Sequence, residues 1–310
     1  MLLLELSAMK KVIFLLMLLP VAAVGQDAAW DHCGGPILQA RRLALWEVAG
    51  STPTPVELPA ALRAASAANL REFSLALGVL DADEQRLAGY VKQNPPFLAF
   101  RLNAARLRQS LGNREVRALW ESKRRGDAIP AKLDPVLEEP LFSGRNCIYL
   151  SAGRLLGEPR HGEFAVTFDY DALPKSAWFT RNSTWAYTLW KTKAWPDQSR
   201  PVSDADRLAF SFSMLAREDA LDYLGLALVD ELRRREPRQK NELAKKLLSA
   251  KSREIFWETV GNESLLEAEV KIDRTLSLDK ALRILAPKDK LRETLSWPEA
   301  APFKDKIAAF

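Results

Sequence analysis

The character of the sequence changes near residue 129, and this change constrains the fold more than any other feature. Before it, apolar residues recur at helical spacing, as in PILQARRLALWEV (36–48) and AALRAASAANLREFSLALGVL (60–80). After it, short runs of β-branched and aromatic residues are bounded by Gly and Pro, which is typical of strands. The pattern predicts an α+β chain, with a helical N-terminal bundle over 26–128. A mixed α/β domain with a small, mainly antiparallel sheet is predicted over 129–310.

Local signals predict further elements in both parts. Asp81-Ala82-Asp83-Glu84 is a helix-capping pattern at the start of EQRLAGYVKQ. Two more helices are predicted in FLAFRLNAARLRQSLG (97–112) and NREVRALWESKRRG (113–126). The strand candidates of the second part are RNCIYLSAG, GEFAVTFDYDAL and SAWFTRNSTWAYTLWKT. A long helical section is predicted from 203 to about 260, and a last strand in LLEAEVKI (265–272).

Residues 1–25 have the form of a secretory signal peptide, with Met9 as the true start. Lys10 and Lys11 precede the apolar run VIFLLMLLPVAAV (12–24), which ends in small residues. The run is shorter than the roughly 20 residues that span a bilayer, so a membrane anchor is the weaker interpretation. We therefore expect an exported bacterial protein, periplasmic or secreted, with no membrane partner after the signal is removed.

The chain has two cysteines, Cys33 and Cys147, and two histidines, His32 and His161. In an oxidising compartment the cysteines can form one disulfide, and two buried free thiols are the alternative. No cluster of Cys and His has ligand spacing, so no metal site is expected. The net charge of +5 is mild for 310 residues, and we interpret the basic helix faces as solvated surface. No nucleic-acid partner is expected.

The strand candidate LLEAEVKI alternates apolar and polar residues, which predicts one buried and one polar face. Its apolar residues are Leu266, Ala268, Val270 and Ile272. Glu267 and Glu269 then project from the polar face, roughly 7 Å apart. Two carboxylates at that spacing can serve one catalytic site, and a solvated strand face is the alternative.

The residues that follow extend this pattern. Glu-Ala-Glu-Val, continued by a polar turn and LSLDKALRIL, resembles the last conserved strand of ADP-ribosyltransferase-like toxin folds. In those folds a Glu-x-Glu or Glu-x-Gln pair heads a strand that runs into a short closing helix. The upstream segment PRHGEFAVTFDYDALPKSAWFTRNSTW (159–185) is similar to the part of these folds that precedes the nicotinamide pocket. The resemblance covers about 144–286.

This resemblance implies NAD as the cofactor and assigns roles by position. Glu269 or Glu267 would stabilise the oxocarbenium ion that forms as nicotinamide leaves, and the other glutamate would orient the acceptor. An arginine near the first strand would clamp a phosphate or the ribose. The implied cofactor-binding residues are Arg145, Arg154, Ser183, Thr184, Trp178 and Phe179, with Trp185 as a further stacking residue.

Two hypotheses for function follow. The first is an exported NAD-dependent ADP-ribosyltransferase-like enzyme that modifies a protein. The second is a non-enzymatic periplasmic protein of the protein-binding or immunity type. A glycan hydrolase is a weaker third hypothesis, because two carboxylates on one strand face do not flank a scissile bond. The protein partner is unknown, and the sequence leaves open whether the chain is an enzyme.

Overall fold

The structure is a computed structural model of the chain, and it describes residues 32–41, 58–127, 143–153, 162–181 and 202–310. In these ranges an eight-stranded sheet has the order β10-β9-β4-β1-β3-β7-β5-β6, and β2 and β8 form a separate pair. Neighbouring strands of the large sheet are antiparallel, except for the parallel pair β9 and β10. The strands are β1 (Leu98–Leu102), β2 (Glu115–Arg117), β3 (Cys147–Ala152), β4 (Phe164–Phe168), β5 (Trp178–Thr180), β6 (Leu215–Ala216), β7 (Glu269–Asp273), β8 (Thr275–Ser277), β9 (Ala281–Ala286) and β10 (Ile307–Ala309).

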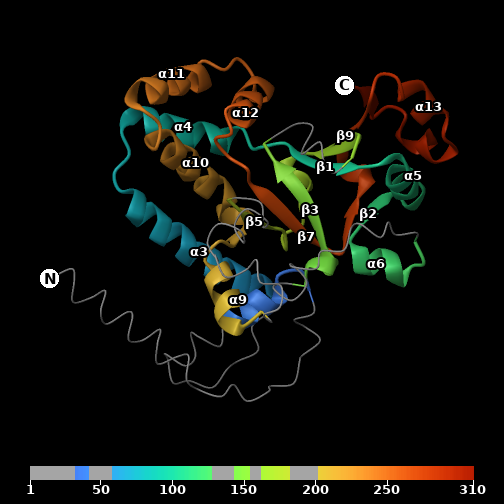
Figure 1. Ribbon diagram of the computed structural model, residues 1–310, viewed down its shortest axis with the longest axis horizontal. Coiled ribbons are helices and arrows are strands. Elements are labelled where there is room, and N and C mark those ends of the chain that lie inside the picture. Colours follow the sequence, from blue (N-terminus) through green and yellow to red (C-terminus); the bar gives the residue numbers. More distant parts are fainter. Residues whose placement is uncertain (1–31, 42–57, 128–142, 154–161, 182–201) are drawn as a thin grey trace.

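The helices lie in two groups on either side of the strands (Figure 1). One group contains α3 (Leu58–Leu77), α4 (Ala82–Gln93), α10 (Arg217–Arg233), α11 (Pro237–Leu248) and α12 (Arg253–Asn262). The other contains α5 (Ala104–Asn113), α6 (Leu119–Arg124) and α13 (Leu291–Ser296), and α9 (Asp204–Ser211) lies below the first group in this view. Among the described residues, none of the helices has the length and apolarity that crossing a membrane requires.

The predicted mixture of helix and sheet is confirmed, but the predicted small sheet is wrong. The main sheet has eight strands, and three of them, β1, β6 and β9, come from stretches that were expected to be helix or turn. Residues 281–286 form β9 after the short 3-10 turn Leu278–Lys280, where the resemblance implied a short closing helix. β9 is a strand because it pairs with both β4 and β10. Local sequence patterns do not reveal pairing between segments that are distant in the chain.

The helix predicted over 97–112 is also corrected. β1 occupies 98–102, and Asn103 then caps α5 by accepting a hydrogen bond from the backbone N–H of Arg106. β1 lies between β3 and β4, so its backbone groups are satisfied on both edges. The N-terminal part is therefore not all-helical. The domain boundary near 128 lies outside the described residues and stays a prediction.

Close backbone approaches fix how these elements pack. Gly225 of α10 faces α4, where an added Cβ would lie 2.9 Å from the carbonyl oxygen of Ala88. Gly162 precedes β4 with a φ of +149°, and a Cβ there would lie 2.3 Å from the carbonyl carbon of Leu102. Only glycine allows both contacts. The main core fills the space between the sheet and α4, α10 and α12 with buried aliphatic and aromatic side chains.

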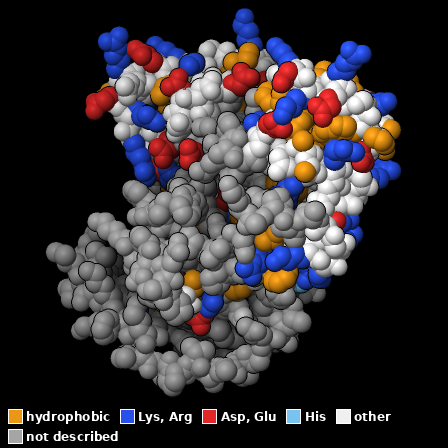
Figure 2. All heavy atoms as spheres, turned by 45° about the vertical axis from the view of Figure 1, so that its right-hand side comes forward, with side chains coloured by type: hydrophobic (Ala, Val, Ile, Leu, Met, Phe, Trp, Pro, Cys, Tyr) orange, Lys and Arg blue, Asp and Glu red, His pale blue; other side chains and the backbone are white. Residues whose placement is uncertain are grey.

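Charges of both signs are mixed over the described surface in the view of Figure 2. Many form short ion pairs, such as Lys92 with Asp222 at 2.9 Å and Lys290 with Glu163 at 2.5 Å. Exposed pairs of this kind contribute little to stability individually.

Candidate functional site

The residues of β7 divide cleanly between the two faces of the sheet. Val270 and Ile272 are fully buried in the main core, as the alternation predicted. Glu269, Lys271 and Asp273 project from the opposite face, because successive side chains of a strand point to opposite sides. This face therefore carries an alternating row of charge: a carboxylate, an ammonium and a second carboxylate. We call these three residues the β7 charged row.

Lys271, at the centre of the row, has a fully buried side chain with 0% exposure. Its Nζ lies 2.8 Å from Oε2 of Glu269 and donates a 2.5 Å hydrogen bond to Oγ1 of Thr180. Nζ also lies 5.0 Å from the centroid of the Trp178 ring, within range of a cation–π interaction. A buried ammonium is costly unless it is paired and hydrogen-bonded. These contacts supply that compensation.

The neighbouring strand β5 brings these partners into place. In its antiparallel register with β7, Thr180 lies opposite Glu269 and Trp178 lies opposite Lys271. Trp178 is 1% exposed and belongs to a second apolar cluster with Cys33, Ile37, Phe210 and Met214. Phe179 points the other way, into the main core. The Trp178 indole thus closes the space beside the ammonium and keeps water from it.

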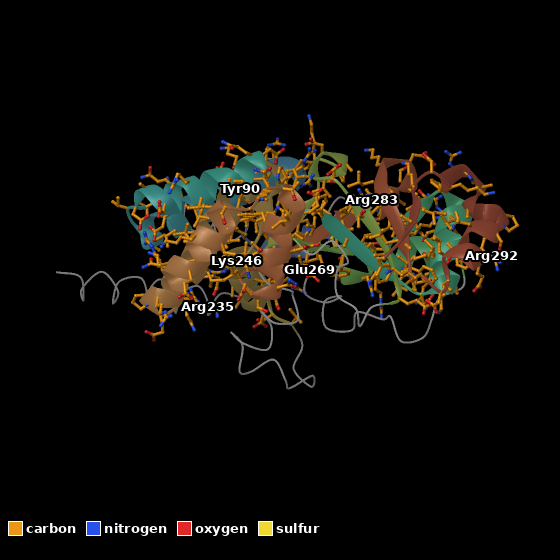
Figure 3. All side chains as sticks on the ribbon, turned by 90° about the horizontal axis from the view of Figure 1, so that it is seen from above. Tyr90, Arg235, Lys246, Glu269, Arg283 and Arg292 are labelled. Carbon is orange, nitrogen blue, oxygen red and sulfur yellow. A yellow bond between two sulfur atoms is a disulfide. The ribbon has the colours of Figure 1, made fainter. Side chains whose placement is uncertain are left out.

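Glu269 reaches solvent with a side chain 20% exposed, much as Asp273 does at the other end of the row with 21%. It stands at the first residue of β7, between the helical group that carries Tyr90 and Lys246 and the half that carries Arg283 (Figure 3). Its carboxylate is held at one oxygen by Lys271. A fixed, partly exposed carboxylate can stabilise a cation that forms next to it.

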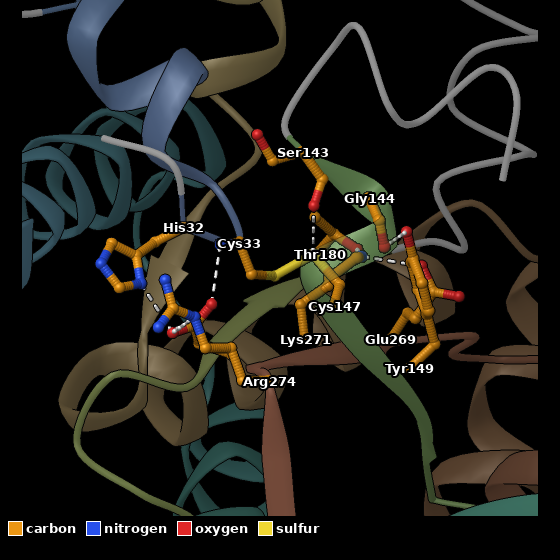
Figure 4. Close-up of a disulfide and its surroundings, with 11 residues drawn as sticks. His32, Cys33, Ser143, Gly144, Cys147, Tyr149, Thr180, Glu269, Lys271 and Arg274 are labelled. Carbon is orange, nitrogen blue, oxygen red and sulfur yellow. Dashed lines mark hydrogen bonds and ion pairs between the residues drawn. A yellow bond between two sulfur atoms is a disulfide. The ribbon is translucent and has the colours of Figure 1, made fainter. Parts of the chain in front are cut away.

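The other end of the row anchors the N-terminal segment. Oδ2 of Asp273 lies 2.8 Å from Nδ1 of His32, and its Oδ1 accepts a 3.0 Å hydrogen bond from the backbone N–H of Cys33. Cys147 lies opposite Asp273 in the register of β3 with β7, and it forms the disulfide with Cys33. Figure 4 shows this disulfide beside Lys271 and Thr180. The predicted pairing of Cys33 with Cys147 is confirmed.

The two predicted catalytic glutamates are not equivalent. Glu267 is exposed and precedes β7, which begins at Glu269. Leu266 and Ala268 around it are buried, so the predicted burial pattern continues before the strand, and the Ala268 carbonyl still accepts a 2.9 Å hydrogen bond from the Ala152 N–H. The structure therefore places Glu269 among partners and leaves Glu267 at the surface. A shared catalytic role for the two glutamates stays a prediction.

The predicted cofactor-binding residues lie in different places. Trp178 is close to the charged row, and Phe179 is core. Arg145 lies 5.5 Å from the centroid of the Trp120 ring. It precedes Cys147, which is four residues along β3 from the position opposite Glu269, so at least about 13 Å of strand separates it from Glu269. Arg154, Ser183, Thr184, His161 and Trp185 lie outside the described residues.

Sequence reasoning missed Lys271 and Thr180. The alternation placed Lys271 on the polar face, and a lysine there is expected to reach solvent. Its burial depends on Trp178 from another strand, which no local pattern reveals. Thr180 could have been found, because it lies in the same aromatic, strand-forming stretch as Trp178. In the described part of the chain, no group of three or more His, Cys, Asp or Glu residues could hold a metal ion.

In comparisons with known proteins, no family model matches the chain and no curated protein matches it.

Proposed function

We propose that the chain is an exported protein, periplasmic or secreted, in which the start of β7 forms an NAD-dependent ADP-ribosyltransferase-like site centred on Glu269. The observation that carries the proposal is the position of Glu269: partly exposed, held by Lys271 and opposite Thr180 on the next strand. The sequence resemblance of this strand and of the Trp178–Thr180 segment supports the same assignment. The Cys33–Cys147 disulfide supports export, because disulfides persist in oxidising compartments.

In the proposed reaction, the bond between nicotinamide and C1 of its ribose breaks, and nicotinamide leaves with the bonding electron pair. The ribose becomes an oxocarbenium ion, which the Glu269 carboxylate stabilises more than it stabilises neutral ground-state ribose. A nucleophilic side chain of an acceptor protein, or water, then bonds to C1 and loses a proton. Glu267, exposed two residues before Glu269, would orient the acceptor.

The second candidate function is non-enzymatic protein binding, and a specific observation favours it. The Lys271 ammonium lies 2.8 Å from Glu269 and offsets its negative charge. A carboxylate neutralised in this way stabilises a cation less than an isolated one does. In this alternative the ion pair is a structural contact of the sheet, and an exported protein would act through its surface.

Calorimetric titration of NAD into the mature protein, residues 26–310, separates the two functions. The enzymatic proposal predicts saturable binding at millimolar NAD or below, in the wild type and in Glu269→Gln. Binding survives in the variant because Glu269 acts chiefly on the transition state. Glu258→Gln, at an exposed position of α12, is the matched control for loss of one carboxylate charge. A folded, disulfide-bonded protein that takes up no NAD would overturn the enzymatic proposal and favour the second function.

A further inference from the structure

We propose that Lys271 is a positioning residue that fixes the Glu269 carboxylate for catalysis. The inference rests on the ADP-ribosyltransferase-like function proposed above and adds a residue that the sequence resemblance does not assign. Lys271 does not touch substrate in this account, because its side chain is fully buried. It acts through Glu269.

The first argument is geometric. Residues two apart on a strand share a face and lie roughly 7 Å apart, which is too far for two short side chains to meet. The long lysine side chain closes this gap and brings Nζ to 2.8 Å from Oε2 of Glu269. The Thr180 hydroxyl, opposite Glu269 on β5, holds the same ammonium at 2.5 Å. Two strands thereby define where the ammonium, and hence the carboxylate, lies.

The second argument concerns the cost of moving either partner. The buried Lys271 ammonium cannot turn into water, and the Trp178 ring occupies the space beside it. If Glu269 rotated away, the ammonium would lose its counter-charge while still buried, which costs several kcal/mol in a low-dielectric interior. The 20% exposed carboxylate is therefore held in one orientation by the lysine. Such preorganisation matters because small displacements of a catalytic group lower the rate strongly.

The third argument is electrostatic. A cation in contact favours the ionised form of a carboxylate, and only that form can stabilise an oxocarbenium ion. Asp273, two residues further along the row, faces His32, the Cys33 N–H and Arg274 rather than Lys271. The 2.8 Å contact with Oε2 brings the positive charge of the ammonium to Glu269. The ammonium offsets part of the carboxylate's attraction for a cation, but only a correctly placed, ionised carboxylate can stabilise the cation at all. Losing Lys271 should therefore lower kcat and leave KM for NAD nearly unchanged.

The test measures nicotinamide release from NAD as a function of pH for the wild type, Lys271→Met and Lys271→Gln. Methionine removes charge and donor, whereas glutamine removes only the charge and retains a donor in case the methionine variant does not fold. Lys290→Met is the matched control, because it breaks another Lys–Glu ion pair. Its partner, Glu163, directly precedes β4, which is separated from β7 by β1 and β3 in the sheet. Each protein is assayed below its melting temperature, with the folded fraction determined by circular dichroism.

We expect the acid limb of the pH–rate profile to move up by about one pH unit in both Lys271 variants, because the carboxylate has lost its cation. We expect kcat to fall about tenfold, with KM for NAD within about twofold of the wild type. Lys290→Met should keep the wild-type profile. Wild-type activity with an unmoved acid limb in the Lys271 variants would overturn the positioning role alone. No release by the wild type would overturn the proposed function together with it.

Discussion

At the scale of single residues, Lys271 and Glu269 share one ion pair but differ in their access to water. The lysine is fully buried, whereas the glutamate is one-fifth exposed. Removing one partner of a buried pair is costly mainly because the other charge stays behind without compensation. The cost should therefore depend on which partner remains. The structure therefore predicts that removing Glu269 destabilises the protein more than removing Lys271 does. If the two side chains were equally buried, the two costs would be similar.

Glu269→Gln should lower the free energy of unfolding by about 3 kcal/mol, because it leaves the buried ammonium without a counter-charge. Lys271→Met should cost about 1 kcal/mol, because the remaining carboxylate can turn to water. The double variant should resemble Lys271→Met alone, which a double-mutant cycle by urea unfolding measures. A larger loss for Lys271→Met than for Glu269→Gln would contradict the burial of the ammonium.

The same residues show how far the sequence could predict the site. Alternation along LLEAEVKI correctly predicted that Val270 and Ile272 are core. It could not distinguish a solvated Glu267 from a held Glu269, because both follow the same two-residue period. The difference arises from where β5 ends beside β7, at Thr180. That is tertiary information, and local periodicity does not contain it.

At the scale of elements, Glu84 ties three helices together. It is the buried residue of the predicted capping pattern of α4, in which Asp81 and Glu84 satisfy each other's backbone N–H. Its carboxylate lies 2.6 Å from Nη2 of Arg233, at the end of α10, and 2.8 Å from Nζ of Lys240 in α11. The Arg233 hydrogen bond, with further help from Lys240, lowers the pKa of Glu84 from 4.5 to about 2.

This lowered pKa predicts acid sensitivity of the helical group. Because the pKa of Glu84 is lower in the folded than in the unfolded state, its contribution is complete above about pH 5 and is lost as the pH falls toward 2. Glu84→Gln should lower the free energy of unfolding by roughly 2 kcal/mol at pH 7. Urea unfolding from pH 7 to 2 should show the wild type and the variant converging. If the difference in unfolding free energy between the wild type and Glu84→Gln stayed constant from pH 7 to 2, the predicted role of Glu84 would be wrong.

Helices and strands were predicted well where local side-chain patterns determine the structure. The prediction failed where pairing with distant strands determines it. The cap at Asp81 and the mainly helical section from 203 to about 260 follow from side-chain patterns and were predicted, although the two-residue strand β6 interrupts that section. β1 and β9 were not, because LAFRL and ALRILA fit a helix as well as a strand. Both strands are flanked by partners on each edge, and this satisfies more backbone groups than an isolated helix turn would.

At the scale of the whole molecule, the Cys33–Cys147 disulfide joins positions 114 apart in sequence. It fixes the N-terminal segment to β3, where Ile37 and Leu38 pack in the second apolar cluster with Trp178. Arg41 adds a buried contact, donating a 2.7 Å hydrogen bond to Asn69 of α3. The segment is therefore held both covalently and by packing, on the face that carries the charged row.

Reduction should consequently destabilise the protein without releasing the whole segment. Closing so long a loop restricts the unfolded chain, and losing the bond should cost on the order of 4 kcal/mol. Urea unfolding with and without a phosphine reductant measures this difference. Cys33→Ser/Cys147→Ser should match the reduced wild type and show no further response to reductant. An equal response of the serine variant would mean that the reductant acts elsewhere.

The central claim is that Glu269 is the catalytic carboxylate of an NAD-consuming site, and nicotinamide release tests it most directly. Mature wild type, Glu269→Gln and Glu258→Gln are incubated with NAD at a temperature where all three are folded, and free nicotinamide is quantified by chromatography. The account predicts release by the wild type and by Glu258→Gln, and a rate about 10² to 10³ lower for Glu269→Gln. Equal release by Glu269→Gln, or none by the wild type, would contradict it.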